Sequence, residues 1–217
     1  MSFTVKVCGL TCAADAELAL AAGADLLGFV VHPESPRHCA DVREAAAPAR
    51  ERGVLVMVAL TAEPILRAAA SSGLRKVQPH VPRARRADVL ARLSEAGLEV
   101  ILPWADEPGQ GDPGAGLPLW EPSPRATGVA GGSGRTHAMA YPPPRPFLLA
   151  GGLSAENLQA RYDLLPASVR PRLAGFDAAS RLEAAPGRKD PDKVRAFLRL
   201  ARDLERHHAR RHADLPL

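Results

Sequence analysis

The chain has 217 residues, of which 46% are hydrophobic and only 4% aromatic. A chain of this length can bury a sizeable core, so we expect residues 1–217 to form a single domain, with a frayed end over about 209–217. No apolar run approaches the roughly 18 residues that a membrane helix needs, and no signal-peptide pattern is present. We therefore expect a cytoplasmic protein that does not bind membranes.

The formal net charge of +4 is unevenly distributed along the chain. Part of the excess lies in Arg83, Arg85 and Arg86, and more lies between Arg195 and Arg211, with almost no aromatic residues interleaved for base stacking. We therefore expect no nucleic-acid partner. A basic balance also suits a ligand that is a small phosphorylated acid.

Cysteine and histidine residues give no metal-binding pattern. The three cysteines are Cys8, Cys12 and Cys39. An odd number without metal-ligand spacing predicts reduced thiols rather than a disulfide framework. His207, His208 and His212 could resemble a metal tract, but their place in a charged helical stretch favours a solvated helix face.

One pattern recurs along the chain: a short Val/Leu/Ile run, a loop, and a stretch at helical spacing. The predicted strands are Thr4–Cys8, Leu26–Val31, Val54–Ala59, Arg75–Gln78, Glu99–Leu102, Leu117–Glu121, Phe147–Ala150 and Ala174–Ala178. The predicted helices are Ala13–Ala22, Asp41–Arg52, Glu63–Ser71, Arg83–Ala96, Ser154–Leu164 and Pro191–His208. This alternation predicts an α/β fold with parallel strands, and eight such units favour a (β/α)8, or TIM, barrel.

The pattern breaks between Pro103 and Pro146, where glycine and proline crowd together and no long amphipathic helix can be drawn. We expect a Gly/Pro-rich loop in place of the fifth helix, and a shortened sixth helix. Loops of this length in a compact domain are usually functional or mobile.

Chemistry-bearing residues gather at the predicted carboxyl ends of the strands, where barrels build their active sites. These residues are Cys8 after strand one, Arg37 after strand two, Gln78 and His80 after strand four, Glu121 after strand six, and Asp177 at strand eight. Chance placement would scatter them along the chain. The pattern therefore predicts an enzyme.

Glycine pairs at the same rim predict a phosphate site. Backbone N–H groups can wrap a phosphate only where no Cβ blocks the approach. In barrels this site lies after strands seven and eight, which here carry Gly151 and Gly152, and Ser180 and Arg181. A second such loop holds Gly132, Ser133 and Gly134. A tight turn explains each motif taken singly, whereas their joint placement favours phosphate binding.

Several motifs in order along nearly the whole chain carry a family resemblance. They are KVCGLT at the first strand, GFV followed by SPR up to Arg37, VQ-x-H up to His80, GGSGRT, LAGGL-x-x-EN, and PG-x-KDP-x-KVRAF near the end. Together they resemble the phosphoribosylanthranilate isomerase family of tryptophan biosynthesis.

The resemblance implies a (β/α)8 barrel that performs an Amadori rearrangement without metal or cofactor. Cys8 would be the general base, and a modest shift of its pKa would supply thiolate at neutral pH. Lys6 could favour that thiolate or form an ion pair within the barrel. The family's acid is an aspartate at the end of strand six. Here Glu121 stands at this place, with Ser123 as the competing alignment.

The resemblance also assigns binding residues. Arg37 would hold the anthranilate carboxylate, Asp177 would lie near the ribose hydroxyls and the aromatic amine, and Gln78 and His80 would be polar pocket residues. Three loops depart from the family pattern. The departures are Pro79 and Val81 around the histidine, Ser180–Arg181 in place of Ser-Gly, and His137, Ala138 and Met139 in place of Phe-Asp-Trp.

Two hypotheses of different classes remain. The first is an active isomerase that acts on a phosphorylated small molecule as a monomer or homodimer. The second is a divergent barrel that binds a phosphorylated ligand with lost or altered activity. A third, weaker option is another sugar-phosphate isomerase or epimerase on the same fold, but metal-using versions need ligands at several strand ends that this chain lacks.

Overall fold

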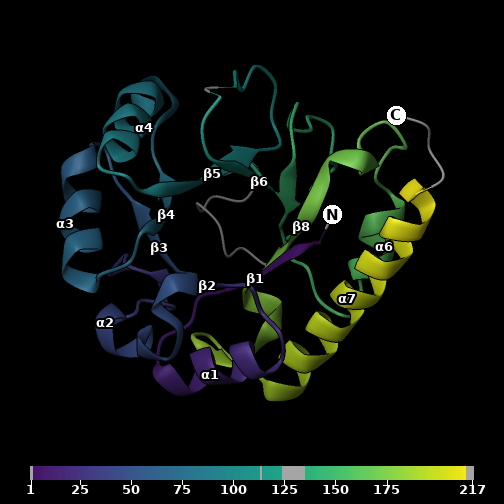
Figure 1. Cartoon of the computed structure of the whole chain (residues 1–217), viewed down its shortest axis with the longest axis horizontal. Coiled ribbons are helices and arrows are strands. Elements are labelled where there is room, and N and C mark those ends of the chain that lie inside the picture. Colours follow the sequence, from purple (N-terminus) through teal and green to yellow (C-terminus); the bar gives the residue numbers. More distant parts are fainter. Residues whose placement is uncertain (1, 113, 124–134, 214–217) are drawn as a thin grey trace.

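The structure is a computed structural model that describes residues 2–112, 114–123 and 135–213 (Figure 1). Eight parallel strands close into a barrel in chain order, because β1 pairs with both β2 and β8. The strands are β1 (Thr4–Cys8), β2 (Leu26–Val30), β3 (Gly53–Val58), β4 (Lys76–His80), β5 (Glu99–Ala105), β6 (Leu117–Glu121), β7 (Phe147–Leu149) and β8 (Leu173–Ala178). The predicted (β/α)8 fold class is confirmed.

Helices surround this barrel (Figure 1). They are α1 (Ala13–Ala21), α2 (Val42–Ala45), α3 (Ala62–Ser72), α4 (Arg86–Glu95), α6 (Leu158–Asp163) and α7 (Pro191–Ala213). Short 3-10 turns add η1 (Ala47–Arg52), η2 (Arg83–Arg85), η3 (Arg170–Arg172) and η4 (Ser180–Leu182). A small antiparallel hairpin, β9 (Glu183–Ala185) with β10 (Arg188–Lys189), was not predicted from the sequence.

The predicted helix over 41–52 is divided into α2 and η1. Asp41 caps α2, because its side chain accepts a hydrogen bond from Glu44 N at 2.9 Å. Pro48 then lies in the first turn of η1, and Ala49 has the non-helical φ of −156°. Proline removes a backbone donor and its ring crowds the preceding turn, so a continuous helix cannot form here.

Strands β4 and β5 continue beyond their predicted ends at Gln78 and Leu102. Each strand runs through a proline, and both prolines stay in register, with Met57 opposite Pro79 and Pro103 opposite Leu119. A proline cannot donate to the ladder, but its carbonyl and its neighbours can still pair. The longer β4 carries His80 to the mouth of the barrel.

The loop between β5 and β6 agrees with the prediction that no fifth helix forms. Residues 106–112 and 114–116 contain no helix. Arg145 holds this loop, because its Nε donates to both carboxylate oxygens of Asp112, at 3.0 and 2.9 Å. A shortened sixth helix was expected between β6 and β7. Residues 122–123 and 135–146 contain no helix, and residues 124–134 lie outside the described residues.

Two apolar clusters make up the core. The barrel interior holds Cys8, Val54, Val56, Ile101, Leu119, Leu148 and Ala150. A larger cluster between the strands and the surrounding helices includes Phe29, Ile65, Phe147, Phe176 and Phe197. Burying apolar surface on both faces of the strands stabilises the barrel and leaves its carboxyl-terminal mouth for polar residues.

Helix α7 differs from its prediction in two respects. It extends to Ala213, beyond the expected end at His208. His208 is 8% exposed and packs against Phe3, and its Nδ1 lies 3.1 Å from the Tyr162 hydroxyl, whereas His207 is exposed. The expectation of a solvated face is therefore wrong for His208, which anchors the helix. Within the described ranges, no helix is long and apolar enough to cross a membrane.

Candidate active site

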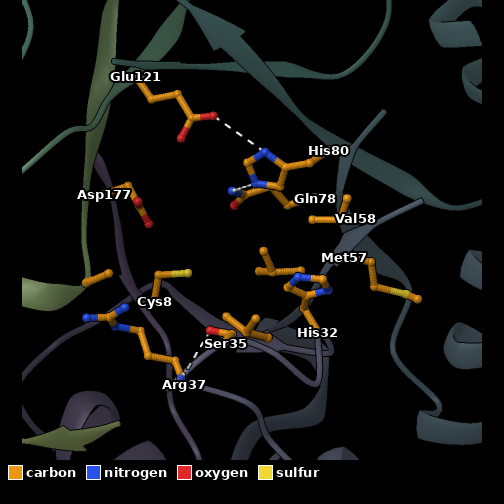
Figure 2. A pocket seen from close by; sticks show the side chains of 13 residues that line it. Cys8, His32, Ser35, Arg37, Met57, Val58, Gln78, His80, Glu121 and Asp177 are labelled. Atoms are coloured by element: carbon orange, nitrogen blue, oxygen red, sulfur yellow. Dashed lines mark hydrogen bonds and ion pairs between the residues drawn. The ribbon is translucent and has the colours of Figure 1, made fainter. Parts of the chain in front are cut away.

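One pocket opens at the carboxyl ends of the strands and holds the residues predicted to carry chemistry (Figure 2). Its volume is about 620 Å³, part of it open to solvent. Its polar lining is Cys8, His32, Ser35, Arg37, Gln78, His80, Glu121 and Asp177. Val30, Val56, Met57, Val58 and Ala179 complete the wall. Six predicted site residues, from five different strands or the loops after them, therefore meet in one place.

Cys8 ends β1, with its sulfur at the base of this pocket. The residue is 7% exposed, and a Cβ on the neighbouring Gly28 would lie 2.6 Å from Sγ. Burial raises the pKa of the thiol, an effect that the positive charge of Lys6 opposes only in part. The expectation of a readily formed thiolate is therefore wrong for the ligand-free protein, which holds a neutral thiol at pH 7.

Lys6 and Asp177 form a buried ion pair beneath Cys8. Lys6 is fully buried, and its Nζ lies 2.7 Å from Asp177 Oδ1, on residues that pair across the β1–β8 seam. Burial lowers the pKa of Lys6, but Asp177 and Cys8 raise it by more, so the pKa stays above its ordinary value. Lys6 is therefore a permanent cation whose carboxylate partner offsets the desolvation of both groups.

Glu121 ends β6 and lies opposite Cys8 across the pocket (Figure 2). It is 6% exposed, and its pKa is raised to about 8, mainly by burial and secondarily by the charge of Asp177. At pH 7 its carboxyl group is therefore mostly protonated and able to donate a proton. Ser123 does not line this pocket, and its hydroxyl donates to Glu107 Oε2 at 2.7 Å.

His80 and Gln78 lie beside Glu121 on β4. His80 Nδ1 is 3.6 Å from Glu121 Oε1, and His80 Nε2 is 3.3 Å from Gln78 Nε2. Burial, then the charges of Lys6 and Arg86, lowers the pKa of His80 to about 4. Because both His80 and Glu121 are mostly uncharged at pH 7, their contact is not an ion pair. Gln78 Oε1 is buried without a hydrogen-bond partner among the described residues, so it can accept from a ligand.

Arg37 lies on the loop after β2, on the same side of the pocket as Cys8 (Figure 2). Its guanidinium is paired with Glu183, which begins the β9–β10 hairpin, and Glu183 also accepts from Lys189. Neither Glu183 nor Lys189 was predicted to have a role. Lys189 falls within the KDP motif of the family resemblance, which could have singled it out, whereas Glu183 had no comparable signal.

The four described residues predicted to bind phosphate, Gly151, Gly152, Ser180 and Arg181, do not line this pocket. Gly151 and Gly152 follow β7 with φ of +93° and +61°, a backbone conformation that side chains disfavour. The carboxamide of Asn157 fixes their turn, because Nδ2 donates to Gly152 O at 2.8 Å. Ser180 and Arg181 begin η4, directly after β8 and Ala179. Gly132, Ser133 and Gly134 lie outside the described residues.

The segment with the altered family residues, 137–139, is tied to the ends of β5 and β6. His137 Nδ1 lies 3.1 Å from Asp106 Oδ2, and its ring packs edge-on against Trp120 at 5.1 Å. Asp106 Oδ1 also accepts from Tyr141 N at 2.7 Å and from the Trp120 indole at 3.2 Å. These contacts hold the segment without the aromatic residues that are usual in the family.

The described ranges contain no group of three or more His, Cys, Asp or Glu side chains that could hold a metal ion. The groups that meet in the pocket are instead a thiol, a protonated carboxyl, a neutral imidazole and an arginine. The fold and this site define an acid–base enzyme on a (β/α)8 barrel.

Comparison with known proteins specifies the family. A sequence profile of N-(5'-phosphoribosyl)anthranilate (PRA) isomerase matches residues 131–199. The chain is 35% identical to the N-(5'-phosphoribosyl)anthranilate isomerase of Azorhizobium caulinodans over 94% of both chains. It is 33% identical to the enzyme of the same name from Paracoccus denitrificans, over 91% of this chain and 96% of the relative.

Solved structures agree with the sequence comparison. The phosphoribosyl anthranilate isomerase of Thermus thermophilus superposes with a TM-score of 0.75 at 30% identity, over 93% of this chain and 100% of that one. A phosphoribosyl anthranilate isomerase in complex with reduced 1-(o-carboxyphenylamino)-1-deoxyribulose 5-phosphate shares the fold, with a TM-score of 0.69 at 24% identity over 93% of this chain and 99% of that one. This chain belongs to the N-(5'-phosphoribosyl)anthranilate isomerase family.

Proposed function

We propose that the chain catalyses the Amadori rearrangement of N-(5-phosphoribosyl)anthranilate to 1-(2-carboxyphenylamino)-1-deoxyribulose 5-phosphate in tryptophan biosynthesis. The observation that carries this proposal is the position of a buried thiol, Cys8, opposite a protonated carboxyl, Glu121, across one pocket (Figure 2). An acid and a base on opposite walls are what this rearrangement requires. Nothing in the site or the comparisons favours the divergent barrel.

The first step opens the sugar ring. Glu121 donates its proton to the furanose oxygen while the bond from C1 to that oxygen breaks, and the aromatic nitrogen forms a positively charged Schiff base with C1. A carboxyl with a pKa of about 8 is suited to this donation, because it still holds its proton at neutral pH. Glutamate reaches one methylene further than the aspartate of the family, and Glu121 extends from the last residue of β6 into the pocket.

The second step moves a proton from C2. Cys8 releases its own proton to solvent when the substrate binds, and then takes the C2 proton as a thiolate. The resulting enolamine becomes the ketone when C1 takes this proton from Cys8 and the C2 hydroxyl gives its proton to Glu121, so both groups return to their starting states. The positive charges of Lys6 and Lys189 favour the thiolate and partly oppose the effect of burial. The cationic Schiff base adds a further positive charge at the moment when the thiolate is needed.

The polar groups around Cys8 and Glu121 are assigned to substrate binding. Arg37 would hold the anthranilate carboxylate, Asp177 would accept from a ribose hydroxyl or the aromatic amine, and Gln78 would offer its unpaired carbonyl oxygen. His80 would contact the substrate as a neutral imidazole. Backbone groups at Gly151 and Gly152, together with Ser180 and Arg181, are assigned to the phosphate, as are Gly132, Ser133 and Gly134 from the sequence alone.

The experiment is an assay of purified protein on freshly generated substrate. Cys8→Ala and Glu121→Gln should each lower kcat by at least about a hundredfold, in the range expected for loss of general acid–base catalysis. Ser123→Ala is the matched control and should retain activity, since its hydroxyl is bonded to Glu107. Wild-type turnover in both catalytic variants would refute the assigned roles, and an inactive wild type would refute the function.

The organisation of the protein completes the proposal. A single domain spanning 1–217, acting as a monomer or homodimer on a small phosphorylated substrate, agrees with one closed barrel that supplies every lining residue of the pocket. A cytoplasmic location is supported by the three cysteines, which are all free. Light scattering at several protein concentrations would establish the oligomeric state.

A further inference from the structure

One edge of the Arg37 guanidinium is occupied by Glu183. Arg37 Nε donates to Glu183 Oε1 at 2.7 Å, and Nη2 donates to Oε2 at 2.9 Å. The Glu183 side chain is only 4% exposed and that of Arg37 13% exposed, so the pair is largely shielded from water. Two parallel charge-assisted bonds fix both the position and the plane of the guanidinium.

Among the described residues, the end-on edge of Arg37 remains for a ligand. A guanidinium has five N–H donors, and the side-on pairing with Glu183 uses one on Nε and one on Nη2. The end-on edge, with one hydrogen from Nη1 and the second from Nη2, is another two-point fork for a carboxylate. Arg37 lines the pocket on the same side as Cys8 (Figure 2), and we expect the aromatic end of the substrate to bind at this edge.

Lys189 preserves the positive charge of this arrangement. Its Nζ donates to Glu183 Oε1 at 2.9 Å and to Ala179 O at 3.1 Å, and its side chain is fully buried. Arg37 and Glu183 alone would be neutral as a pair. With Lys189, two cations share one carboxylate, and the cluster keeps one net positive charge that can attract a ligand carboxylate.

Close packing also restricts the stem of Arg37 and the hairpin that holds it. A Cβ on Gly9 would lie 2.6 Å from Arg37 Cδ, and a Cβ on Gly187 would lie 2.6 Å from Pro36 O. The carbonyl of Gly187 accepts from the Thr11 hydroxyl at 2.8 Å. The arginine is therefore held in place before any ligand binds, which lowers the entropy cost of binding.

We infer that Glu183 is the positioning residue for the carboxylate end of the pocket. It turns the free edge of Arg37 toward the ligand, while Lys189 supplies the charge that Glu183 would otherwise cancel. The β9–β10 hairpin thereby selects ligands with a carboxylate on the aromatic ring. The inference rests on the proposed function for the identity of the ligand.

The first test measures carboxylate preference. Calorimetry compares wild type and Glu183→Gln for binding of the reduced product, 1-(2-carboxyphenylamino)-1-deoxyribitol 5-phosphate, and of the same compound without its carboxyl group. The preference is the ratio of the dissociation constants of the two compounds, and Glu183→Gln should reduce it by about tenfold. In the activity assay this variant should raise KM by a similar factor with little change in kcat. Glu95→Gln, at an exposed site on α4, should change neither. An unchanged preference in folded Glu183→Gln would overturn the inference.

The second test needs no ligand. The Arg37 Nε–H signal in ¹⁵N NMR should be resolved and slow to exchange in wild type, and should be lost or broadened in Glu183→Gln. Lys189→Met covers the case in which that variant does not fold. It should keep the Arg37 signal and lower the carboxylate preference by about fivefold through the lost charge. A persistent signal in Glu183→Gln, or an unchanged preference in Lys189→Met, refutes the inference, whereas failure of wild type to bind the reduced product refutes the proposed function.

Discussion

The buried Glu121 predicts that the residue needed for catalysis destabilises the folded protein at alkaline pH. The carboxyl has a pKa of about 8 in the folded protein and an ordinary value of 4.5. The folded state therefore binds this proton more tightly than the unfolded state. Its contribution to stability is fully present below about pH 4.5 and is lost as the pH rises through 8.

The magnitude follows from the size of the pKa shift. Each pH unit between the two pKa values costs about 1.4 kcal/mol, so the full cost of ionising Glu121 is on the order of 5 kcal/mol. Glu121→Gln has the same shape and cannot ionise. The unfolding free energy of this variant, relative to wild type, should therefore increase by several kcal/mol between about pH 5 and pH 9, while its activity is lost.

Urea unfolding followed by circular dichroism, at a series of pH values, measures this difference. His80 has the opposite effect, because its pKa is lowered to about 4 and its neutral form gains stability as the pH rises. Subtracting the unfolding free energy of wild type from that of Glu121→Gln removes the contribution of His80. For the control variant Glu95→Gln, the difference in unfolding free energy from wild type should not change with pH. A flat difference for Glu121→Gln, or one that falls as the pH rises, would refute this account of the buried acid.

Three further predictions concern the base of the pocket and its rim. Lys6→Met should lower the unfolding free energy by about 3 to 5 kcal/mol, because Asp177 keeps a buried charge without its partner; a loss below about 1 kcal/mol in urea would contradict this. Gly28→Ala should lower kcat by about tenfold or more and also lower the melting temperature, because its Cβ would lie 2.6 Å from Cys8 Sγ and 3.1 Å from the buried Lys6 Nζ; unchanged kcat would show that the sulfur moves freely. Gly151→Ala, at φ +93°, should raise KM and weaken inhibition by inorganic phosphate, and unaltered inhibition would remove this turn from the phosphate site.

The sequence predicted the barrel well because strand and helix alternate with clear periodicity. It also predicted which residues meet at the mouth, because carboxyl ends of parallel strands share one rim, and Cys8, Arg37 and Glu121 do meet there. Strand ends were less predictable. β4 passes through Pro79, since its pairing with β3 continues through His80 despite the missing donor.

Properties that depend on burial could not be predicted from sequence. The neutral thiol of Cys8 and the protonated carboxyl of Glu121 result from desolvation by distant segments, which no local pattern encodes. Glu183 was missed for a related reason. It lies 146 residues from Arg37 in the chain, and a single acidic residue in a short hairpin has no distinguishing spacing.

The β9–β10 hairpin affects how this barrel could be redesigned. Glu183 supports the guanidinium, and Lys189 reaches from the same carboxylate to Ala179, directly before the turn assigned to phosphate. Under the proposed function, one exchange in the hairpin should therefore affect binding at both ends of the substrate. Engineering for altered ring substituents is better aimed at the apolar wall of β3, where Val56 and Val58 contribute shape without charge.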